Sequence, residues 1–184
     1  MKKIFLIILI FYFLSPANAS FKKKVIENLE NIQNISFDFE QTINEKKEGG
    51  NCVIQYPKKI YCNYDNINKK IMVSNGESLV IKDNSINQFY IYPLKKTPLN
   101  LILDKKFLIG EIKKSKPRVI DNEYLNFTIK KGDYKINLFF NNKTLNLIGW
   151  QTEDVYQNLV ITFLSKIKIN IIIDKNIFKL PSRN

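Results

Sequence analysis

The spacing of apolar residues changes once near the start of the chain, from a helical period to a period of two. Over residues 21–34 apolar side chains recur every three or four positions, at Phe21, Val25, Ile26, Leu29 and Ile32. This spacing predicts an amphipathic helix, which we expect to pack on its own domain; the alternative is a helix lying in a membrane surface. Over residues 35–43 apolar and polar side chains alternate, which predicts a half-buried strand.

Short alternating runs separated by turn residues continue along the rest of the chain. Gly49-Gly50, Pro57-Lys58-Lys59 and Asn75-Gly76 are predicted turns, and Asn-Gly is among the strongest hairpin signals. Later turns are expected at residues 131–133 and 141–143. Between the turns the pattern predicts strands over residues 52–56, 60–64, 71–74, 78–82, 88–92, 119–120, 124–130, 134–140, 145–152 and 159–169.

One apolar stretch in the middle of the chain has a helical character. Thr97 and Pro98 suit a helix cap and a first turn, and they precede Leu99, Leu101, Ile102 and Leu103. Residues 107–109, before Gly110, extend this helix or form a second short turn. Antiparallel strands joined by tight turns tend to curl. We therefore predict an α+β fold, a curved antiparallel β half-barrel built as a meander, with an N-terminal helix and a mid-chain helical lid over an apolar cavity.

The first residues have the three parts of a secretory signal. Lysines follow Met1, residues 4–14 are apolar throughout, and Ala17-Asn18-Ala19 offers small residues to a signal peptidase. The apolar run is shorter than the roughly 20 residues that span a bilayer, although an uncleaved anchor is the alternative. No cysteine lies near the cleavage point for a lipid anchor. We expect a cleaved signal peptide over residues 1–19 and a single domain over residues 20–184.

The composition excludes several classes of chemistry. Histidine is absent, so the chain holds no Ser-His-Asp triad, no Cys-His pair and no histidine-ligated zinc. Two cysteines cannot by themselves ligate zinc or an iron–sulfur cluster. We therefore expect no cofactor, no metal and no enzymatic activity.

The net charge is +12, from 29 Lys and Arg against 17 Asp and Glu. Only Arg118 and Arg183 are arginine, whereas recognition of phosphate and guanine favours guanidinium groups. The excess lysine accompanies an excess of Ile and Asn, and all three residues have A/T-rich codons, so we do not expect a nucleic-acid partner. The basic surface remains a candidate contact for an anionic membrane or an acidic partner.

The two cysteines admit two states. If Pro57 centres its hairpin, Cys52 and Cys62 lie opposite one another, which makes a cross-strand disulfide geometrically feasible. An oxidising compartment favours the bond, and two free thiols are the alternative. The spacing is not Cys-x-x-Cys, so we do not expect a redox-active pair.

Short groups of residues, spread over nearly the whole chain after the predicted signal, accompany this order of elements. They are Ile35-Ser36-Phe37-Asp38-Phe39-Glu40-Gln41, Gly49-Gly50, Tyr56-Pro57, Tyr64, Val73-Ser74-Asn75-Gly76, Pro93-Leu94, Thr97-Pro98-Leu99, Leu103, Leu147, Trp150, Asp154, Asn158, Asn170, Ile173-Asp174, Phe178 and Pro181. In this order, behind a secretory signal, they resemble the LolA family of periplasmic carriers of outer-membrane lipoproteins. No single piece is specific, and the ordered set carries the resemblance.

The resemblance implies a half-barrel whose helices form a lid over an apolar cavity. Family members accept lipoproteins from an inner-membrane lipoprotein-releasing ABC transporter, shield the acyl chains and deliver the cargo to an outer-membrane receptor or to the outer membrane itself. The chain would then be a monomeric carrier of acylated lipoproteins in the periplasm of a Gram-negative bacterium. The family often has an arginine before the strand-turn proline, where it helps to hold the lid closed. Here that position is Tyr56, a candidate latch without a charge.

Apolar side chains of the predicted strands and helix are candidates for the cavity and its lid. For the cavity they are Phe37, Phe39, Ile54, Ile60, Tyr64, Phe89 and Ile91. For the lid they are Leu99, Ile102 and Leu103, which would fill the empty cavity. The alternative for each residue is an ordinary place in the core, where aromatic stripes usually lie.

Two other functions remain as alternatives. A periplasmic half-barrel could be a sensor or interaction domain that binds lipoproteins or lipids for envelope signalling. A secreted hydrolase could use paired carboxylates, and the nearest pairs are Asp38 with Glu40 and Glu153 with Asp154. The first pair lies on the outward face of a predicted strand and the second in a turn, so neither is expected to be buried enough for a raised pKa.

Overall fold

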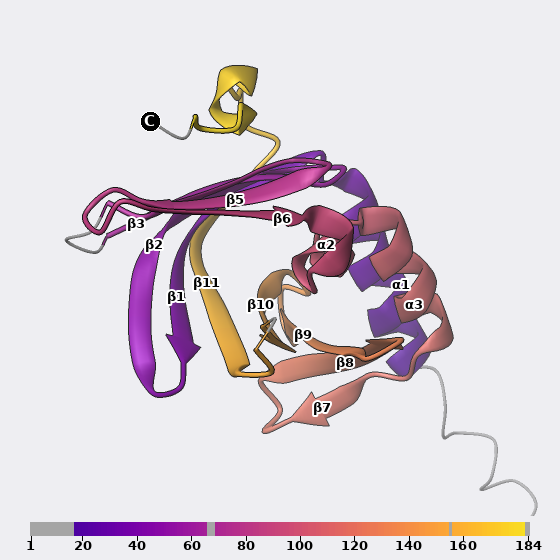
Figure 1. Ribbon diagram of the computed structural model, residues 1–184. Helices are drawn as coiled ribbons and strands as arrows, with labels where there is room; N and C mark the ends of the chain where they lie inside the picture. The colour runs from indigo at the N-terminus through magenta and orange to yellow at the C-terminus, as the bar shows by residue number, and fades with distance from the viewer. Residues whose placement is uncertain (1–16, 66–68, 155, 183–184) are drawn as a thin grey trace, which may run out of the picture.

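The computed structural model in Figure 1 describes residues 17–65, 69–154 and 156–182. Residues 1–16, which make up most of the predicted signal peptide, lie outside the described residues. Within the described part of the chain, every helix is too short or too polar to cross a bilayer.

Among the described residues the helices are few and short, and eleven strands make up most of the fold. The helices are α1 (Ala17–Asn31), α2 (Leu99–Ile102) and α3 (Lys105–Lys114), with the 3₁₀ turns η2 (Leu94–Lys96) and η3 (Lys175–Phe178). The strands are β1 (Asn34–Ile43), β2 (Lys46–Gln55), β3 (Lys59–Tyr64), β4 (Ile71–Asn75), β5 (Ser78–Asp83), β6 (Gln88–Pro93), β7 (Arg118–Ile120), β8 (Tyr124–Lys131), β9 (Tyr134–Asn141), β10 (Leu147–Glu153) and β11 (Leu159–Ile169).

All strands form one sheet in the order β6-β5-β4-β3-β2-β1-β11-β10-β9-β8-β7, and every pair of neighbours is antiparallel. The sheet curls without closing, because β6 and β7 end it on opposite sides (Figure 1). The predicted half-barrel is therefore confirmed. The predicted single meander is divided into two meanders, β1–β6 and β7–β11, which join where the first strand pairs with the last.

The helices lie on the concave side of the sheet, which we call the inner face (Figure 1). Helices α1 and α3 lie side by side, and Val25 and Leu29 of α1 are buried beneath them. Each helix also supplies a lysine to the carbonyl end of the other. Lys22 Nζ donates to Lys113 O at 2.9 Å, and Lys105 Nζ donates to Ile32 O at 2.6 Å. A lysine at a helix C-terminus satisfies carbonyls that lack an intrahelical partner.

Two helix boundaries differ from the sequence-based expectation. Helix α1 ends at Asn31, because Asn170 donates its side-chain amide to Asn31 O at 2.9 Å and accepts from Gln33 N at 2.7 Å. Helix α3 continues through Gly110 to Lys114, as a separate helix that begins after Asp104. Asp104 Oδ1 accepts the Phe107 amide at 3.0 Å and thereby caps α3.

The Gly49-Gly50 pair lies inside β2, so the predicted turn at this position is wrong. The turn falls five residues earlier in the chain, at Asn44 and Glu45, whose φ angles of 47° and 67° suit a two-residue hairpin. A Cβ on Gly50 would overlap Asn63 O of the neighbouring β3. The glycine therefore permits close approach of two strands, which a sequence pattern does not separate from turn formation.

The hairpins at residues 57–59, 75–76, 131–133 and 141–143 follow the predicted turns. Asn75 and Gly76 join β4 to β5, and Gly76 has a φ of 106° that an L-residue rarely adopts. Pro57 lies in the turn between β2 and β3, which places Cys52 directly opposite Cys62. The two sulfur atoms are bonded as a disulfide, with a Cα–Cα distance of 4.1 Å.

Candidate functional site

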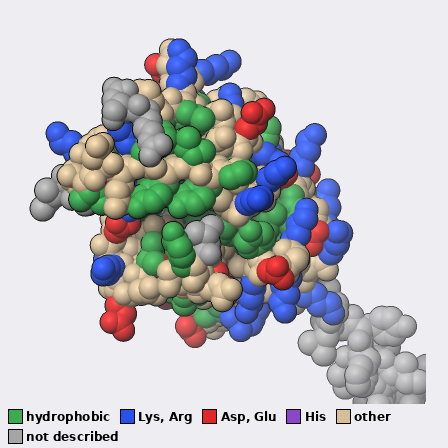
Figure 2. Space-filling view, in the orientation of Figure 1, with side chains coloured by type: hydrophobic (Ala, Val, Ile, Leu, Met, Phe, Trp, Pro, Cys, Tyr) green, Lys and Arg blue, Asp and Glu red, His purple; other side chains and the backbone are tan. Residues whose placement is uncertain are grey.

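A cavity of about 270 Å³ lies between the inner face of the sheet and residues 97–102. Its lining is mainly apolar and comes from β1, β2, β3, β4, β5, β6, β10, β11 and α2: Phe37, Phe39, Ile43, Cys52, Ile60, Cys62, Tyr64, Met72, Leu79, Ile81, Tyr92, Pro98, Leu99, Ile102, Trp150 and Val160. Figure 2 shows hydrophobic side chains gathered in the middle of one face of the molecule, with lysines around them.

Aromatic rings form the floor of the cavity. The alternation of β1 directs Phe37 and Phe39 to the inner face, where both are buried. The ring of Phe37 meets Trp150 edge to face, with centroids 6.1 Å apart, and that of Phe39 meets Tyr64 at 5.0 Å. These edge-to-face pairs fix the floor, so enlargement of the cavity is more easily achieved on the opposite side, at the helices.

Polar groups are confined to part of the cavity wall. Glu48 pairs with Lys70, whose ammonium group also lies 3.9 Å from the centroid of the Tyr64 ring. Burial, followed by the charge of Glu48, raises the pKa of Tyr64 well above its ordinary value. Gln41 Nε2 donates to Thr162 Oγ1 at 3.0 Å. Because these polar groups bind one another, the cavity offers an apolar guest a wall with few unsatisfied donors.

Tyr92 and Tyr156 both line the cavity, from β6 and from the β10–β11 loop. Burial raises the pKa of Tyr92, and a hydrogen bond with the Tyr156 side chain raises it further. Tyr156 remains 73% exposed. Asp154 shapes this loop by accepting the main-chain amides of Tyr156 at 2.8 Å and Asn158 at 2.9 Å. The loop therefore presents an aromatic side chain at the open end of the cavity.

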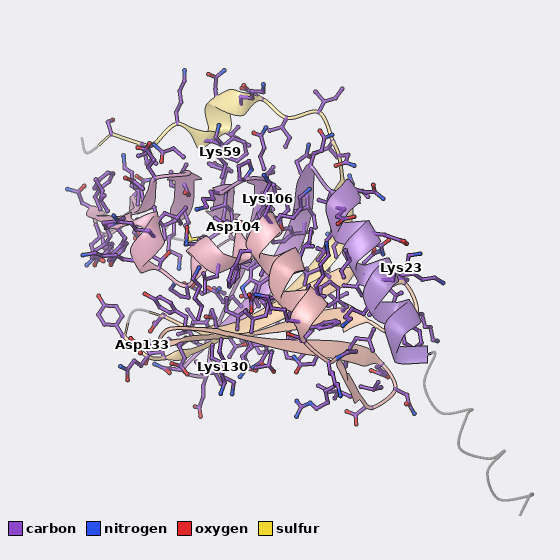
Figure 3. The ribbon with its side chains drawn as sticks, turned by 90° about the vertical axis from the view of Figure 1, so that its right-hand side faces the viewer. Lys23, Lys59, Asp104, Lys106, Lys130 and Asp133 are labelled. Carbon is purple, nitrogen blue, oxygen red and sulfur yellow. A yellow bond between two sulfur atoms is a disulfide. The ribbon has the colours of Figure 1, made fainter. Side chains whose placement is uncertain are left out.

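Residues 94–114, which we call the lid, are held to the sheet from two sides. On one side the amide of Lys58 donates to Leu103 O at 3.0 Å, and Lys58 Nζ lies 3.6 Å from Asp104 Oδ2. On the other side Tyr134 of β9 donates its hydroxyl to Lys96 O at 3.0 Å. Figure 3 looks onto this part and labels Asp104 and Lys106 on the lid, Lys59 at the start of β3, Lys130 in β8 and Asp133 in the turn between β8 and β9.

Most of the predicted cavity and lid residues meet at this cavity. Phe37, Phe39, Ile60 and Tyr64 line it on the sheet side, and Leu99 and Ile102 line it on the lid side. Ile54 and Leu103 are 1% and 0% exposed and belong to the surrounding core without lining the cavity.

Phe89 and Ile91 lie on the opposite, outer face of the sheet. They line a shallow apolar groove together with Val80 and with Leu180 and Pro181 of the C-terminal segment. Their neighbours in β6 explain the discrepancy. Tyr90 and Tyr92 are also apolar enough for an inner face, so the alternation of β6 does not distinguish its two sides. The register with β5 determines which side of β6 faces the cavity. Tyr92 pairs with Leu79 of the cavity, and Ile91 pairs with Val80 of the groove.

Tyr56, the candidate latch, lies beside the lid. Its amide donates to Gln33 O at 3.0 Å, and Lys105 Nζ lies 5.6 Å from its ring centroid. Burial raises the pKa of Tyr56 to about 12. The hydrogen bond between this turn and the lid comes from Lys58, two residues later, and it uses the main chain.

Several lining residues were missed by the sequence analysis. Trp150 is the largest, and its strand does not alternate simply, because Leu147, Gly149, Trp150 and Thr152 are all buried and the register shifts between Leu147 and Gly149. The pattern marks such residues as core, and their place beside Phe37 follows from β1 pairing with β11, which joins distant parts of the chain. Met72 of β4 and Leu79 and Ile81 of β5 also line the cavity and were missed.

Comparison with known families gives one match over most of the chain. The family model described as outer membrane lipoprotein carrier protein LolA matches residues 30–181, which include every strand and the lid. No protein of curated function matches the sequence.

Several solved structures are similar to this chain at low identity. An uncharacterized conserved protein from Thermus thermophilus is 8% identical, with a TM-score of 0.52, and the match covers 89% of this chain and 94% of that one. A LolA superfamily protein from Nitrosomonas europaea is 12% identical, with a TM-score of 0.44 and coverage of 86% and 97%. The MucA/MucB complex from Pseudomonas aeruginosa has a chain that is 11% identical, with a TM-score of 0.48 and coverage of 91% and 62%.

Proposed function

This chain belongs to the LolA family of outer membrane lipoprotein carrier proteins, and from that membership we propose that it carries acylated lipoproteins through the periplasm. It would accept its cargo from an inner-membrane lipoprotein-releasing ABC transporter and deliver it to an outer-membrane receptor or to the outer membrane itself. The observation that carries the proposal is the apolar cavity under the lid. Transport of this kind needs no catalytic group and no cofactor.

The cavity offers an acyl chain an apolar environment that water does not. Each exposed methylene costs about 0.8 kcal/mol, so a lipid-modified protein cannot diffuse between membranes unless its chains are shielded. At about 270 Å³ the cavity is slightly smaller than pockets that bury small ligands, which hold roughly 300–1,000 Å³. The closed form therefore needs to enlarge, and displacement of Leu99 and Ile102 would enlarge it.

The polar links between the sheet and the part of the lid over the cavity are weak. A protein hydrogen bond contributes about 0.5–1.5 kcal/mol net; residues 94–104 accept one from Lys58 and one from Tyr134, and Leu94 donates one to Glu77 O. The partly exposed ion pair between Lys58 and Asp104 adds at most about 1 kcal/mol. Ile102 and Leu103 are also almost fully buried, so opening the lid exposes apolar surface, and cargo must replace this burial with its own methylenes at about 0.8 kcal/mol each. Release then requires a destination with similar apolar burial, such as a bilayer.

The disulfide is consistent with the proposed compartment. Cys52 and Cys62 are both buried and bonded, and disulfides persist in oxidising compartments such as the bacterial periplasm. The bond joins β2 to β3 directly beneath the cavity, so it keeps part of the wall together while the lid moves.

The proposal is tested by transfer of a lipopeptide between vesicles. Donor vesicles carry a fluorescent diacylated peptide, acceptor vesicles carry a quencher, and purified protein is added. We expect protein-dependent transfer that Phe39→Glu abolishes, because a carboxylate in the cavity opposes an acyl chain. Phe163→Glu is the matched control, since Phe163 is 52% exposed.

The outcomes separate the two candidate functions. Equal transfer with and without protein would contradict the carrier. Tight binding of the lipopeptide without release to acceptor vesicles would instead support a periplasmic domain that senses lipoproteins or lipids.

A further inference from the structure

Strand β6 leaves one long edge of the sheet without a partner. It is the terminal strand of the sheet order, and no described segment pairs with its outer side. The opposite edge strand, β7, has only 3 residues and begins with Arg118. We infer that the outer edge of β6 binds the extended polypeptide segment that follows the acylated residue of the cargo, as an added antiparallel strand. The inference rests on the proposed carrier function.

The sequence of β6 lacks the usual protection of an edge. Gln88–Pro93 contains no charged residue, whereas edge strands of soluble proteins commonly carry lysine, an inward charge or a bulge that prevents pairing. Lysine is abundant elsewhere in this chain, with Lys82 in β5 and Lys95 just after β6. The absence of lysine is therefore particular to β6. Within this strand only Pro93, at its end, restricts pairing.

The register shows which main-chain groups are available. Leu94 N donates to Glu77 O at 2.8 Å, and the pairing of β5 with β6 continues from this bond without a shift. In an antiparallel pair, hydrogen-bonded and non-bonded residue pairs alternate. Tyr92 and Tyr90 therefore bond to β5, whereas Phe89 and Ile91 direct their N–H and C=O groups outward.

Both faces of β6 offer apolar surface to the side chains of an added strand. On the inner face the rings of Tyr90 and Tyr92 stack, with centroids 6.4 Å apart and planes at 13°. On the outer face Ile91 is 59% exposed beside the groove that Leu180 lines. Strand addition gains affinity from main-chain bonds and specificity from alternate side-chain sites, and β6 provides both.

The position of the cavity identifies the occupant and its direction. Tyr92 lines the cavity and is also part of β6, so a polypeptide that leaves the cavity meets the Pro93 end of the strand first. It then runs toward Gln88, which is antiparallel to β6. Lys95 and Lys96 are exposed beside the Pro93 end and favour a carboxylate early in the segment. A second copy of this chain lacks the acyl group that would place it there.

The test compares two probes with the purified protein. One is a fluorescent fatty acid, and the other is a diacylated cysteine followed by five residues, of which the first is glutamate. Ile91→Pro removes an outward N–H without removing a bond to β5, and Ile91→Ala changes the side chain but keeps that N–H. We expect Ile91→Pro to weaken lipopeptide binding about tenfold and Ile91→Ala about two- to threefold, while both variants bind the fatty acid like the wild type.

Hydrogen exchange supplies a direct measurement. The amides of Phe89 and Ile91 should exchange more slowly with the lipopeptide bound, and at the unprotected rate with the fatty acid bound. Equal lipopeptide affinity in the wild type and Ile91→Pro overturns the inference. So does a wild-type dimer that Ile91→Pro dissociates, because the occupant is then a second copy. If neither probe binds, the carrier function itself fails.

Discussion

The main-chain amide of Lys58 donates a hydrogen bond to the carbonyl oxygen of Leu103, across 3.0 Å, and so ties the β2–β3 turn to the lid. The side chain of Lys58 strengthens the contact, with Nζ 3.6 Å from Asp104 Oδ2. Asp104 is also the cap of α3. One turn of the sheet thus contacts the lid at the point where α2 ends and α3 begins.

Lys58→Gln should loosen the closed lid. The variant keeps the main-chain bond but loses the ion pair, which is partly exposed and contributes at most about 1 kcal/mol. We expect uptake of a fluorescent fatty acid to accelerate about two- to fivefold in stopped-flow measurements at low salt, and the difference to shrink at high salt. Lys59→Gln, at the adjacent position, should behave like the wild type. Unchanged uptake in both variants would show that the ion pair does not restrain the lid.

Ile102→Ala and Leu103→Ala should distinguish a lid side chain that ligand displaces from a side chain that belongs to the core. Both side chains are almost fully buried, so each truncation lowers the free energy of unfolding of the empty protein by about 2–5 kcal/mol. Ile102 lines the cavity and Leu103 does not. With a fatty acid bound, the loss should be smaller for Ile102→Ala than without it, and equal with and without the ligand for Leu103→Ala. Urea denaturation with and without ligand measures both, and the same loss for Ile102→Ala in both conditions contradicts a displaced lid.

Gly50→Ala should destabilise the sheet, and Gly110→Ala should not. A Cβ at Gly50 would overlap Asn63 O, so β2 and β3 would have to separate, whereas Gly110 in α3 has no neighbour within 4 Å of a new Cβ. We expect a loss of more than about 2 kcal/mol at Gly50, as for other overpacked sites. At Gly110 a gain of about 0.5–1 kcal/mol is expected from helix propensity. Thermal denaturation distinguishes the two, and equal effects would contradict the close approach of the strands.

Tyr56 should make stability depend on alkaline pH. Its pKa is raised from 10.0 to about 12 by burial, so the folded protein favours the neutral phenol. For an acid with a raised folded pKa, this contribution is complete below pH 10 and is lost as the pH rises to about 12. Tyr56→Phe should therefore lose less stability than the wild type between pH 10 and about 12, measured by urea denaturation. Parallel curves for the two proteins would exclude the burial of this hydroxyl.

The sequence pattern predicts the fold well and the cavity in part. Alternation in β1 and β3 places Phe37, Phe39 and Ile60 on one face, and the same face lines the cavity. In β6 the alternation is ambiguous, because residues of both faces are apolar, and there Phe89 and Ile91 were assigned to the opposite side from the one they occupy.

Sequence patterns do not predict hydrogen bonds between main-chain groups of distant segments. The link from Lys58 to Leu103 uses an amide and a carbonyl that every pair of non-proline residues possesses, so no residue type marks it. Gly50 illustrates the converse. The glycine pair is visible in the sequence, but the neighbouring carbonyl that requires it comes from another strand.

The pairing of β1 with β11 also governs the order in which the molecule can assemble. The two halves of the sheet share their central seam between residues near the start and the end of the chain, with Phe39 beside Leu164. Contacts so distant in sequence form slowly, because the entropy of closing a long loop must be overcome first. If the chain leaves a translocation channel with its amino end first, its two meanders would therefore stay separate until β11 emerges. Until then their apolar inner faces would be exposed to water.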